Sequence, residues 1–257
     1  MKMSTRSVVP LALPFFFVLP LTVHGAHPLI TEDTGTQGIG HFQLELTHDL
    51  SRQKDTGLET RDQTLNAILS AGLSDSLDLI VGLPYERVTE WDGGAKTSAH
   101  GFADMEVAAK WRFYEAGPLS LALRPGLGLP TGNDDKGLSS AHFVPSLFGV
   151  MTYASDPWAF HLHLGYTRNL HDGSDQRNHI YHASMACELG VSDSARLVAD
   201  ASMESSSDLT GPTVASSVVL GLIYSVTSKL ELDLGYREGL TDAAPDHAWL
   251  TGLSLHF

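Results

Sequence analysis

Two short motifs carry the side chains in this sequence that are best suited to chemistry. His182 and Ser184 are two residues apart, as are His161 and His163, so each pair shares one face of an extended chain. A histidine beside a serine suits a nucleophilic hydrolase, which also needs a third group to orient the histidine. Two imidazoles supply half of a metal site. The sequence identifies neither an orienting group nor a third metal ligand, so we expect no catalytic residues, no metal and no cofactor.

Both motifs lie in stretches patterned as strands. The chain ends Trp249-Leu-Thr-Gly-Leu-Ser-Leu-His-Phe257, with bulky residues at alternate positions, and similar segments fill residues 41–257. This period of two predicts strands with one apolar face. No helical pattern supplies a layer to cover those faces, so we expect them to contact lipid. Only a closed barrel can place strands in a bilayer, because an open edge would leave backbone groups unsatisfied in hydrocarbon.

Polar turns divide these segments into 12 strands. Short turns are expected at Ser74–Ser76, Glu115–Pro118, Ala154–Pro157, Ser192–Ala195 and Thr227–Lys229. Longer loops are expected at Arg52–Gly57, Arg87–His100, Thr131–Ser140, His171–Asn178, Ser205–Pro212 and Thr241–Asp246. Outer-membrane barrels have short periplasmic turns, longer extracellular loops and an even strand number. The predicted fold class is therefore all-β, a closed antiparallel 12-stranded transmembrane barrel.

Aromatic residues fall at the two ends of the predicted strands. One ring comprises Phe42, Trp111, Phe113, Tyr153, Trp158, Tyr224 and Phe257, and the other Tyr85, Tyr166, Tyr181, Tyr236 and Trp249. Membrane barrels carry aromatic girdles at both interfaces, whereas a soluble sandwich has no reason to sort its aromatic residues. Breaks in the strand ladder are expected at the prolines within or beside strands, because proline lacks a backbone donor. These are Pro84, Pro125, Pro130 and Pro145. The facing of residues 142–153 is left unassigned.

Residues 1–25 have the order of a secretory signal peptide. Lys2 and Arg6 precede an apolar stretch over residues 8–23 that ends in small residues. We expect cleavage after Gly25, with Ala26 as the alternative site. The stretch is short and broken by three prolines, which argues against an uncleaved membrane anchor.

The net charge limits the classes of binding partner, and the cysteine count limits the possible disulfides. Removing the two leader cations leaves 14 Lys and Arg against 30 Asp and Glu, a net charge of −16. Such a balance argues against nucleic acid as a partner. The single cysteine, Cys187, excludes an intrachain disulfide.

Charged and imidazole side chains occupy the positions opposite the apolar face. The candidates for lining the lumen are Glu45, Glu106, Lys110, Arg112, Arg124, His161, His163, Asp200, Glu231, Asp233 and Arg237. Charges of both signs at bilayer depth require a solvated or mutually paired interior. Two interpretations stay open. The arginines face carboxylates across a selective path, or the charges form salt bridges that only satisfy the interior.

The pair His182 and Ser184 is similar to the His-x-Ser pair of outer-membrane phospholipase A, which is also a 12-stranded barrel. That enzyme needs its pair to face lipid, where its substrate lies. The register predicted here points His182 and Ser184 inward, so a lipid hydrolase is kept only as an alternative.

Longer stretches resemble a bacterial outer-membrane family described as the putative MetA pathway of phenol degradation, often called transporter. They are His27-Pro-Leu-Ile-Thr-Glu-Asp-Thr-Gly-Thr-Gln-Gly38, Phe42-Gln-Leu-Glu45, Glu106-Val-Ala-Ala-Lys-Trp-Arg-Phe-Tyr114, Pro125-Gly-Leu-Gly-Leu-Pro-Thr-Gly132 and Trp158-Ala-Phe-His-Leu-His-Leu-Gly-Tyr-Thr-Arg-Asn169. The resemblance implies uptake of aromatic compounds and no catalytic residues.

The sequence thus predicts a signal peptide over 1–25, a periplasmic or luminal segment over 26–40 and a barrel over 41–257. The expected function is passive passage of small molecules through the outer membrane of a Gram-negative bacterium, and the resemblance implies that these are aromatic compounds. A lipid hydrolase and a non-conducting structural barrel are the alternatives. The expected partners are outer-membrane lipid, a small-molecule solute and the barrel-assembly machinery, which would bind the C-terminal strand ending in Phe257.

Overall fold

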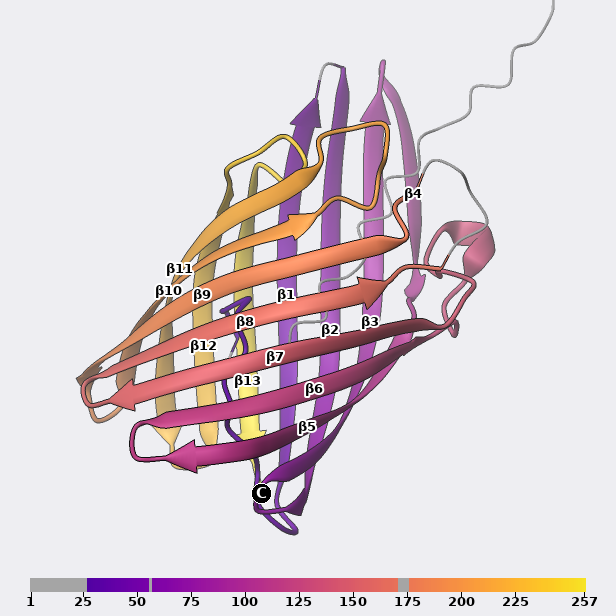
Figure 1. The fold of residues 1–257 in the computed structure, drawn as a ribbon. Helices are drawn as coiled ribbons and strands as arrows, with labels where there is room; N and C mark the ends of the chain where they lie inside the picture. Colours follow the sequence, from indigo (N-terminus) through magenta and orange to yellow (C-terminus); the bar gives the residue numbers. More distant parts are fainter. Residues whose placement is uncertain (1–26, 56, 171–175) are drawn as a thin grey trace, which may run out of the picture.

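The computed structural model describes residues 27–55, 57–170 and 176–257, and they form one closed antiparallel barrel (Figure 1). The strands are β1 (Phe42–Asp55), β2 (Leu58–Ser74), β3 (Leu77–Asp92), β4 (Ala95–Phe102), β5 (Met105–Ala116), β6 (Leu119–Leu129), β7 (Val144–Ser155), β8 (Trp158–Arg168), β9 (His179–Ser192), β10 (Ala195–Ser205), β11 (Val214–Thr227), β12 (Leu230–Gly239) and β13 (His247–His256). One 3₁₀ turn, η1, spans Asp134–Lys136. Sequence neighbours pair except β4 and β5, which both pair with β3, and β1 pairs with β13 to close the sheet. None of the described residues forms a helix long and apolar enough to cross a membrane.

Strands β4 and β5 together make one wall position, so the barrel has 12 strands as predicted. Strand β3 pairs with β5 over Leu77–Gly82 and with β4 over Tyr85–Asp92. The prediction of a loop over Arg87–His100 is therefore wrong: this stretch is mostly a hairpin. Its turn is Gly93-Gly94, where φ is 53° and 91°, and such a glycine pair suits a two-residue hairpin turn.

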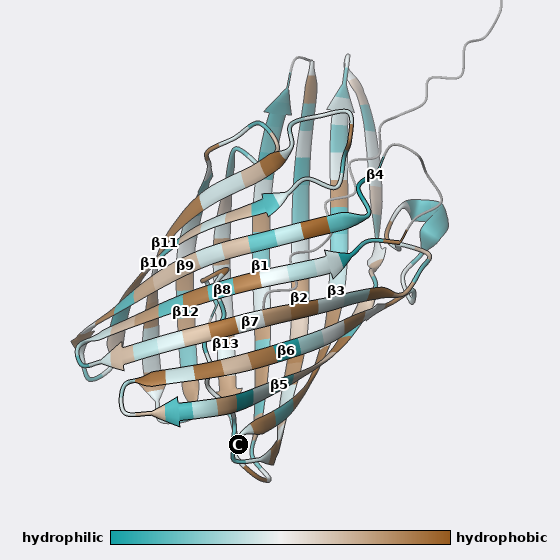
Figure 2. Cartoon of the chain, viewed as in Figure 1, coloured by the Kyte–Doolittle hydropathy of each residue, from teal (hydrophilic) through white to brown (hydrophobic). Residues whose placement is uncertain are grey.

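The predicted facing of the strands is confirmed by the alternation of exposure. Leu79 and Leu164 are exposed, for example, while Ile80 and His163 beside them are buried. Hydrophobic and hydrophilic residues accordingly alternate along the ribbons in Figure 2. Strand β7, whose facing the sequence left open, directs Phe148, Val150 and Thr152 inward and Leu147 outward.

The prolines lie where the ladders are interrupted or end, as predicted. The partner of β3 changes from β5 to β4 at Pro84. The ladder between β5 and β6 has a gap at Pro125, between the pairs Ala108–Gly126 and Trp111–Leu123. Pro130 follows the end of β6, and Pro145 lies next to the start of β7. Because proline cannot donate a backbone hydrogen bond, these are the places where a closed barrel tolerates it.

The outward face predicts a stability difference between two leucines. Leu162→Arg, in the middle of β8, should lower the free energy of unfolding in lipid vesicles by about 2–4 kcal/mol, because it places a charge in hydrocarbon. Leu209→Arg, in the exposed connection between β10 and β11, is the matched control and should have little effect. Equilibrium unfolding in urea measures both. Equal losses for the two variants would contradict a lipid-facing Leu162.

Candidate functional site in the barrel interior

Residues 27–38 run through the interior of the barrel and contact strands from all around its wall. Leu29 packs with Ala186, Val198 and Ile223, and Ile30 packs in a second cluster with Val219, Ala248 and Leu250. The backbone N–H groups of Ile30 and Thr31 donate to the Asp200 carboxylate at 3.1 and 2.7 Å. The apolar start of this segment is thus held against β9–β13 by both packing and hydrogen bonds.

Two glycines in the wall make room for the start of the segment. A Cβ atom at Gly221 would lie 2.6 Å from Cγ of Pro28, and one at Gly235 would lie 2.6 Å from its Cβ. Real side chains do not approach so closely. Strands β11 and β12 therefore accommodate Pro28 because both carry glycine at this level.

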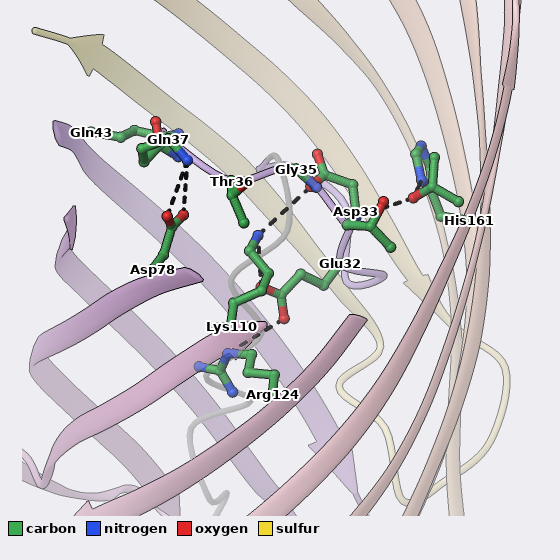
Figure 3. A network of polar contacts seen from close by, with 12 residues as sticks. Glu32, Asp33, Gly35, Thr36, Gln37, Gln43, Asp78, Lys110, Arg124 and His161 are labelled. Carbon is green, nitrogen blue, oxygen red and sulfur yellow. Dashed lines mark hydrogen bonds and ion pairs between the residues drawn. The ribbon is translucent and has the colours of Figure 1, made fainter. Parts of the chain in front are cut away.

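Acidic side chains in the middle of the segment neutralise cations of the opposite wall (Figure 3). Lys110 Nζ lies 3.2 Å from Glu32 and 3.7 Å from Asp33, and Arg124 Nε lies 3.4 Å from Glu32. Arg124 also donates to Glu106 at 2.7 Å. Burial would raise the pKa of the Asp33 carboxyl, but the positive charge of Lys110, together with His161, Arg196 and the N–H of Gly35, outweighs that effect and holds this pKa below its usual range. Arg124, Lys110 and Glu32 are all buried, so each depends on the others for compensation.

The end of the segment is fixed near the periplasmic turns. The N–H of Thr34 donates to Thr152 Oγ1 at 3.1 Å, and the N–H of Gln37 donates to both Asp78 oxygens at 3.0 and 3.1 Å. Glycine at position 72 leaves room for the segment to pass the wall at Gly38, because a Cβ atom at position 72 would lie 1.8 Å from the carbonyl oxygen of Gly38. The segment therefore crosses the interior between two attached ends.

His27 attaches the other end. Its Nδ1 contacts Asp233 and its Nε2 lies 3.3 Å from Asp49. Burial alone would lower the pKa of His27, but the hydrogen bonds with these two carboxylates outweigh burial and raise the pKa from 6.5 to about 9. His27 is therefore protonated at neutral pH and pairs with these two carboxylates of the barrel wall.

All eleven candidates for the lumen lining are buried or partly buried. Glu45, Glu106, Lys110, Arg124, His161, His163 and Asp200 are buried, and Arg112, Glu231, Asp233 and Arg237 are intermediate. The predicted pairing of the arginines differs in one case. Arg112 bonds Glu115 at 3.1 Å and the carbonyl of Asp75, beside the short turns, and does not reach a carboxylate across the interior. The Arg237 guanidinium lies 3.9 Å from Asp49.

The two histidines of β8 have different surroundings. Both ring nitrogens of His161 have partners, Thr152 Oγ1 at 2.9 Å and Glu188 at 3.3 Å. The His163 ring packs against Phe148, with 4.7 Å between centroids. The described residues contain no group of three or more side chains that could hold a metal ion.

The structure supplies the orienting group that the sequence did not reveal for His182. Nε2 of His182 lies 3.0 Å from Ser184 Oγ, and Nδ1 lies 3.2 Å from Glu204 Oε2. Glu204 is directly opposite His182 in the ladder of β9 and β10, so the strand register was the missing information. His182 and Ser184 are buried and face inward, away from lipid.

Solved structures with the same fold are outer-membrane barrels. An outer membrane channel from Pseudomonas putida F1 is 17% identical, with a TM-score of 0.68, and the match covers 88% of this chain and 98% of that one. The NanC porin is 10% identical with a TM-score of 0.54, covering 82% of this chain and 98% of that one. The translocator domain of the autotransporter NalP from Neisseria meningitidis is 14% identical with a TM-score of 0.50, covering 84% and 88%. No curated protein sequence matches the chain.

The closed barrel, its apolar exterior and its charged interior define an outer-membrane β-barrel protein. Residues 32–257 match the family described as the putative MetA-pathway of phenol degradation, and the chain belongs to that family. The match begins at Glu32, inside the luminal segment, so the family pattern includes part of that segment as well as the barrel.

The attachment of His27 predicts a pH dependence of stability. The protonated form is favoured in the folded state, so its contribution is fully present below about pH 6.5 and is lost as the pH rises through about 9. Urea unfolding of the wild type in vesicles should therefore show a falling midpoint between pH 6.5 and 9. His27→Gln should lack this part of the pH dependence, while His256→Gln, on the last strand, should retain it. Identical profiles for the wild type and His27→Gln would contradict the assignment.

Proposed function

We propose that this protein is a passive outer-membrane channel for small molecules, and that residues 27–38 form the constriction of its path. The observation that carries the proposal is the charged interior, in which Lys110 and Arg124 meet Glu32 and Asp33 of the segment. Charged groups of both signs, held by hydrogen bonds within a closed barrel, can select solutes by charge and size. The shared fold of outer-membrane channels and porins supports the same function.

The cargo class that we propose is small aromatic compounds, and the family description supports it. Aromatic solutes carrying a carboxylate or phenolate would meet Arg237, which is only partly buried and lies 3.9 Å from its nearest carboxylate, Asp49. The cation is therefore placed to attract an anionic solute. The protein would need no cofactor for this passage, and we propose that it is not an enzyme.

A reversible crosslink tests whether the segment limits the path. The hydroxyl oxygens of Thr34 and Ser120 lie 2.5 Å apart, so Thr34→Cys with Ser120→Cys should form a disulfide in a Cys187→Ala background. Oxidation should reduce the conductance in planar bilayers severalfold, because it fixes the segment to β6, and a reducing agent should restore it.

The matched control places a disulfide in the wall only. Ser202 and Ser217 are 2.9 Å apart on β10 and β11, and the corresponding pair of cysteines should leave the conductance unchanged. An oxidised Thr34–Ser120 pair that conducts like the reduced one would refute the role of the segment. A wild type without conductance steps would refute the channel itself.

One observation favours a second candidate, an esterase acting inside the barrel. Ser184, His182 and Glu204 have the nucleophile, base and orienting carboxylate of a hydrolase at hydrogen-bond distances. Their inward facing would restrict the substrate to an ester that enters the lumen. A membrane lipid would not reach them.

Substitution of the serine distinguishes this candidate from the channel. If the site hydrolyses esters, purified protein should turn over a small chromogenic ester, and Ser184→Ala should abolish turnover while Ser202→Ala should not. We expect no turnover by the wild type, in line with the channel. Turnover that is lost specifically in Ser184→Ala would replace the channel by the hydrolase.

Two further proposals concern biogenesis. We propose cleavage of the leader after Gly25, or after Ala26, positions that lie outside the described residues. We also propose that the barrel-assembly machinery recognises the last strand through Phe257. In support, the Phe257 side chain is exposed, and its ring stacks on Phe42 with 6.2 Å between centroids at the seam where β13 meets β1.

A further inference from the structure

The outer surface of β1–β4 carries a cluster of cations above the aromatic girdle. In β1 and β2, Arg52, Lys54 and Arg61 all bond the single carboxylate of Glu59, at 3.0, 3.7 and 3.0 Å. Three positive charges thus share one negative charge. Two more cations, Arg87 and Lys96, are exposed on β3 and β4 at outward positions of the same ladder. We define the basic patch as Arg52, Lys54, Arg61, Arg87 and Lys96.

The patch is notable because the chain as a whole is acidic, with 30 Asp and Glu against 16 Lys and Arg. The facing of the strands explains it. Asp62, Glu86 and Glu90 occupy the intervening, inward positions of β2 and β3, so the same strands turn carboxylates inward and cations outward. The local outward surface is therefore positive on a negative protein.

A cavity lies at the lower edge of the patch. It measures about 420 Å³ and is lined by His48, Gln63, Leu65, Tyr85, Arg87 and His100. Arg87 is exposed, and no described carboxylate pairs with it. A guanidinium with free donors beside amide and imidazole groups is well suited to bind phosphate oxygens in a bidentate manner.

The order of side chains along the strands matches the order of groups in a lipid. Leu65 lines the cavity, and Leu69 and Leu79 are exposed below it on the outer face. At its level, Tyr85 packs edge-on against Phe102, with 5.4 Å between centroids, as part of the extracellular girdle. Above it stand the cations. This order on the protein, from apolar groups through an aromatic ring to positive charge, is complementary to a phosphorylated lipid, whose acyl chains end in an anionic headgroup.

We propose that the cavity and the basic patch bind the phosphorylated headgroup of a lipid of the outer leaflet. Arg87 would bind one phosphate in the cavity, and Arg61 and Lys96 would bind further anionic groups above it. The acyl chains would lie along the leucines of β2 and β3. This site is separate from the interior path, so it does not depend on the channel proposal.

Trp91 provides a direct signal for binding. Its ring lies 5.0 Å from the Arg61 guanidinium and 5.3 Å from the Lys96 ammonium, within the patch. A bound phosphate that draws these cations away should change the emission of Trp91. Trp91→Phe identifies the part of the signal that comes from this residue.

The experiment titrates the full-length protein in detergent micelles with bisphosphorylated lipid A. The wild type should bind it, and Arg61→Gln with Arg87→Gln should weaken binding tenfold or more. The matched control is Arg168→Gln, at the extracellular end of β8 and in contact with His179. It is also an outward cation, but it lies outside the patch, so it should bind like the wild type.

Four results would overturn the proposal, and three of them concern the binding of lipid A. They are equal binding of enzymatically dephosphorylated lipid A, unchanged affinity in the Arg61/Arg87 double variant, or an equal loss in Arg168→Gln. Inorganic phosphate is titrated in parallel, and it should compete only weakly because it lacks acyl chains. Saturation by inorganic phosphate at the same concentration as the lipid would assign the site to free phosphate and refute the lipid. Bilayer conductance of the double variant should equal that of the wild type, so a failure here is distinct from a failure of the channel.

Discussion

Satisfaction of the backbone hydrogen bonds in hydrocarbon is the constraint from which the rest of this structure follows. A strand in lipid has no water to bond, so every strand needs two neighbours, and the pairing of β1 with β13 supplies the last of them. Closure fixes the facing of each residue, because a shift by one position would exchange the lipid and interior faces. The division between leucines outside and charges inside is therefore a consequence of closure as much as of composition.

Closure also creates an interior that must balance its own charges. Arg124 is 1% exposed, and Lys110 is buried on the neighbouring strand. Cations at such depth are destabilising unless they are paired and hydrogen-bonded. Residues 27–38 supply Glu32 and Asp33 for this purpose, and their apolar start fills space beside β9–β13. This one segment thus provides both packing and charge neutralisation in the barrel interior.

The sequence was sufficient for the barrel and for which residues face inward, since period-two alternation is a local signal. The sequence did not reveal which residues on different strands lie side by side. The partner of His182 is Glu204 on another strand, and only the register of β9 against β10 identifies it. The prediction of a loop at the hairpin of β3 and β4 fails because the outward positions there are polar, and the alternation of apolar residues stops above the membrane. There the Gly93-Gly94 pair was the better signal, because it marks a tight turn between continuing strands.

The loss of apolar alternation above the aromatic girdle also allows charged residues on the outer surface. Above the girdle a strand no longer has to present apolar groups to lipid, so its outward positions are free to carry charge. On β2 those positions carry Glu59 and Arg61, and on β3 they carry Arg87, whereas the inward carboxylates continue the charged interior. An acidic protein in an anionic membrane would repel the surrounding headgroups if its outer surface shared its overall sign. Facing the cations outward at the interface reverses that sign locally, while the inward carboxylates leave the interior acidic at the extracellular mouth.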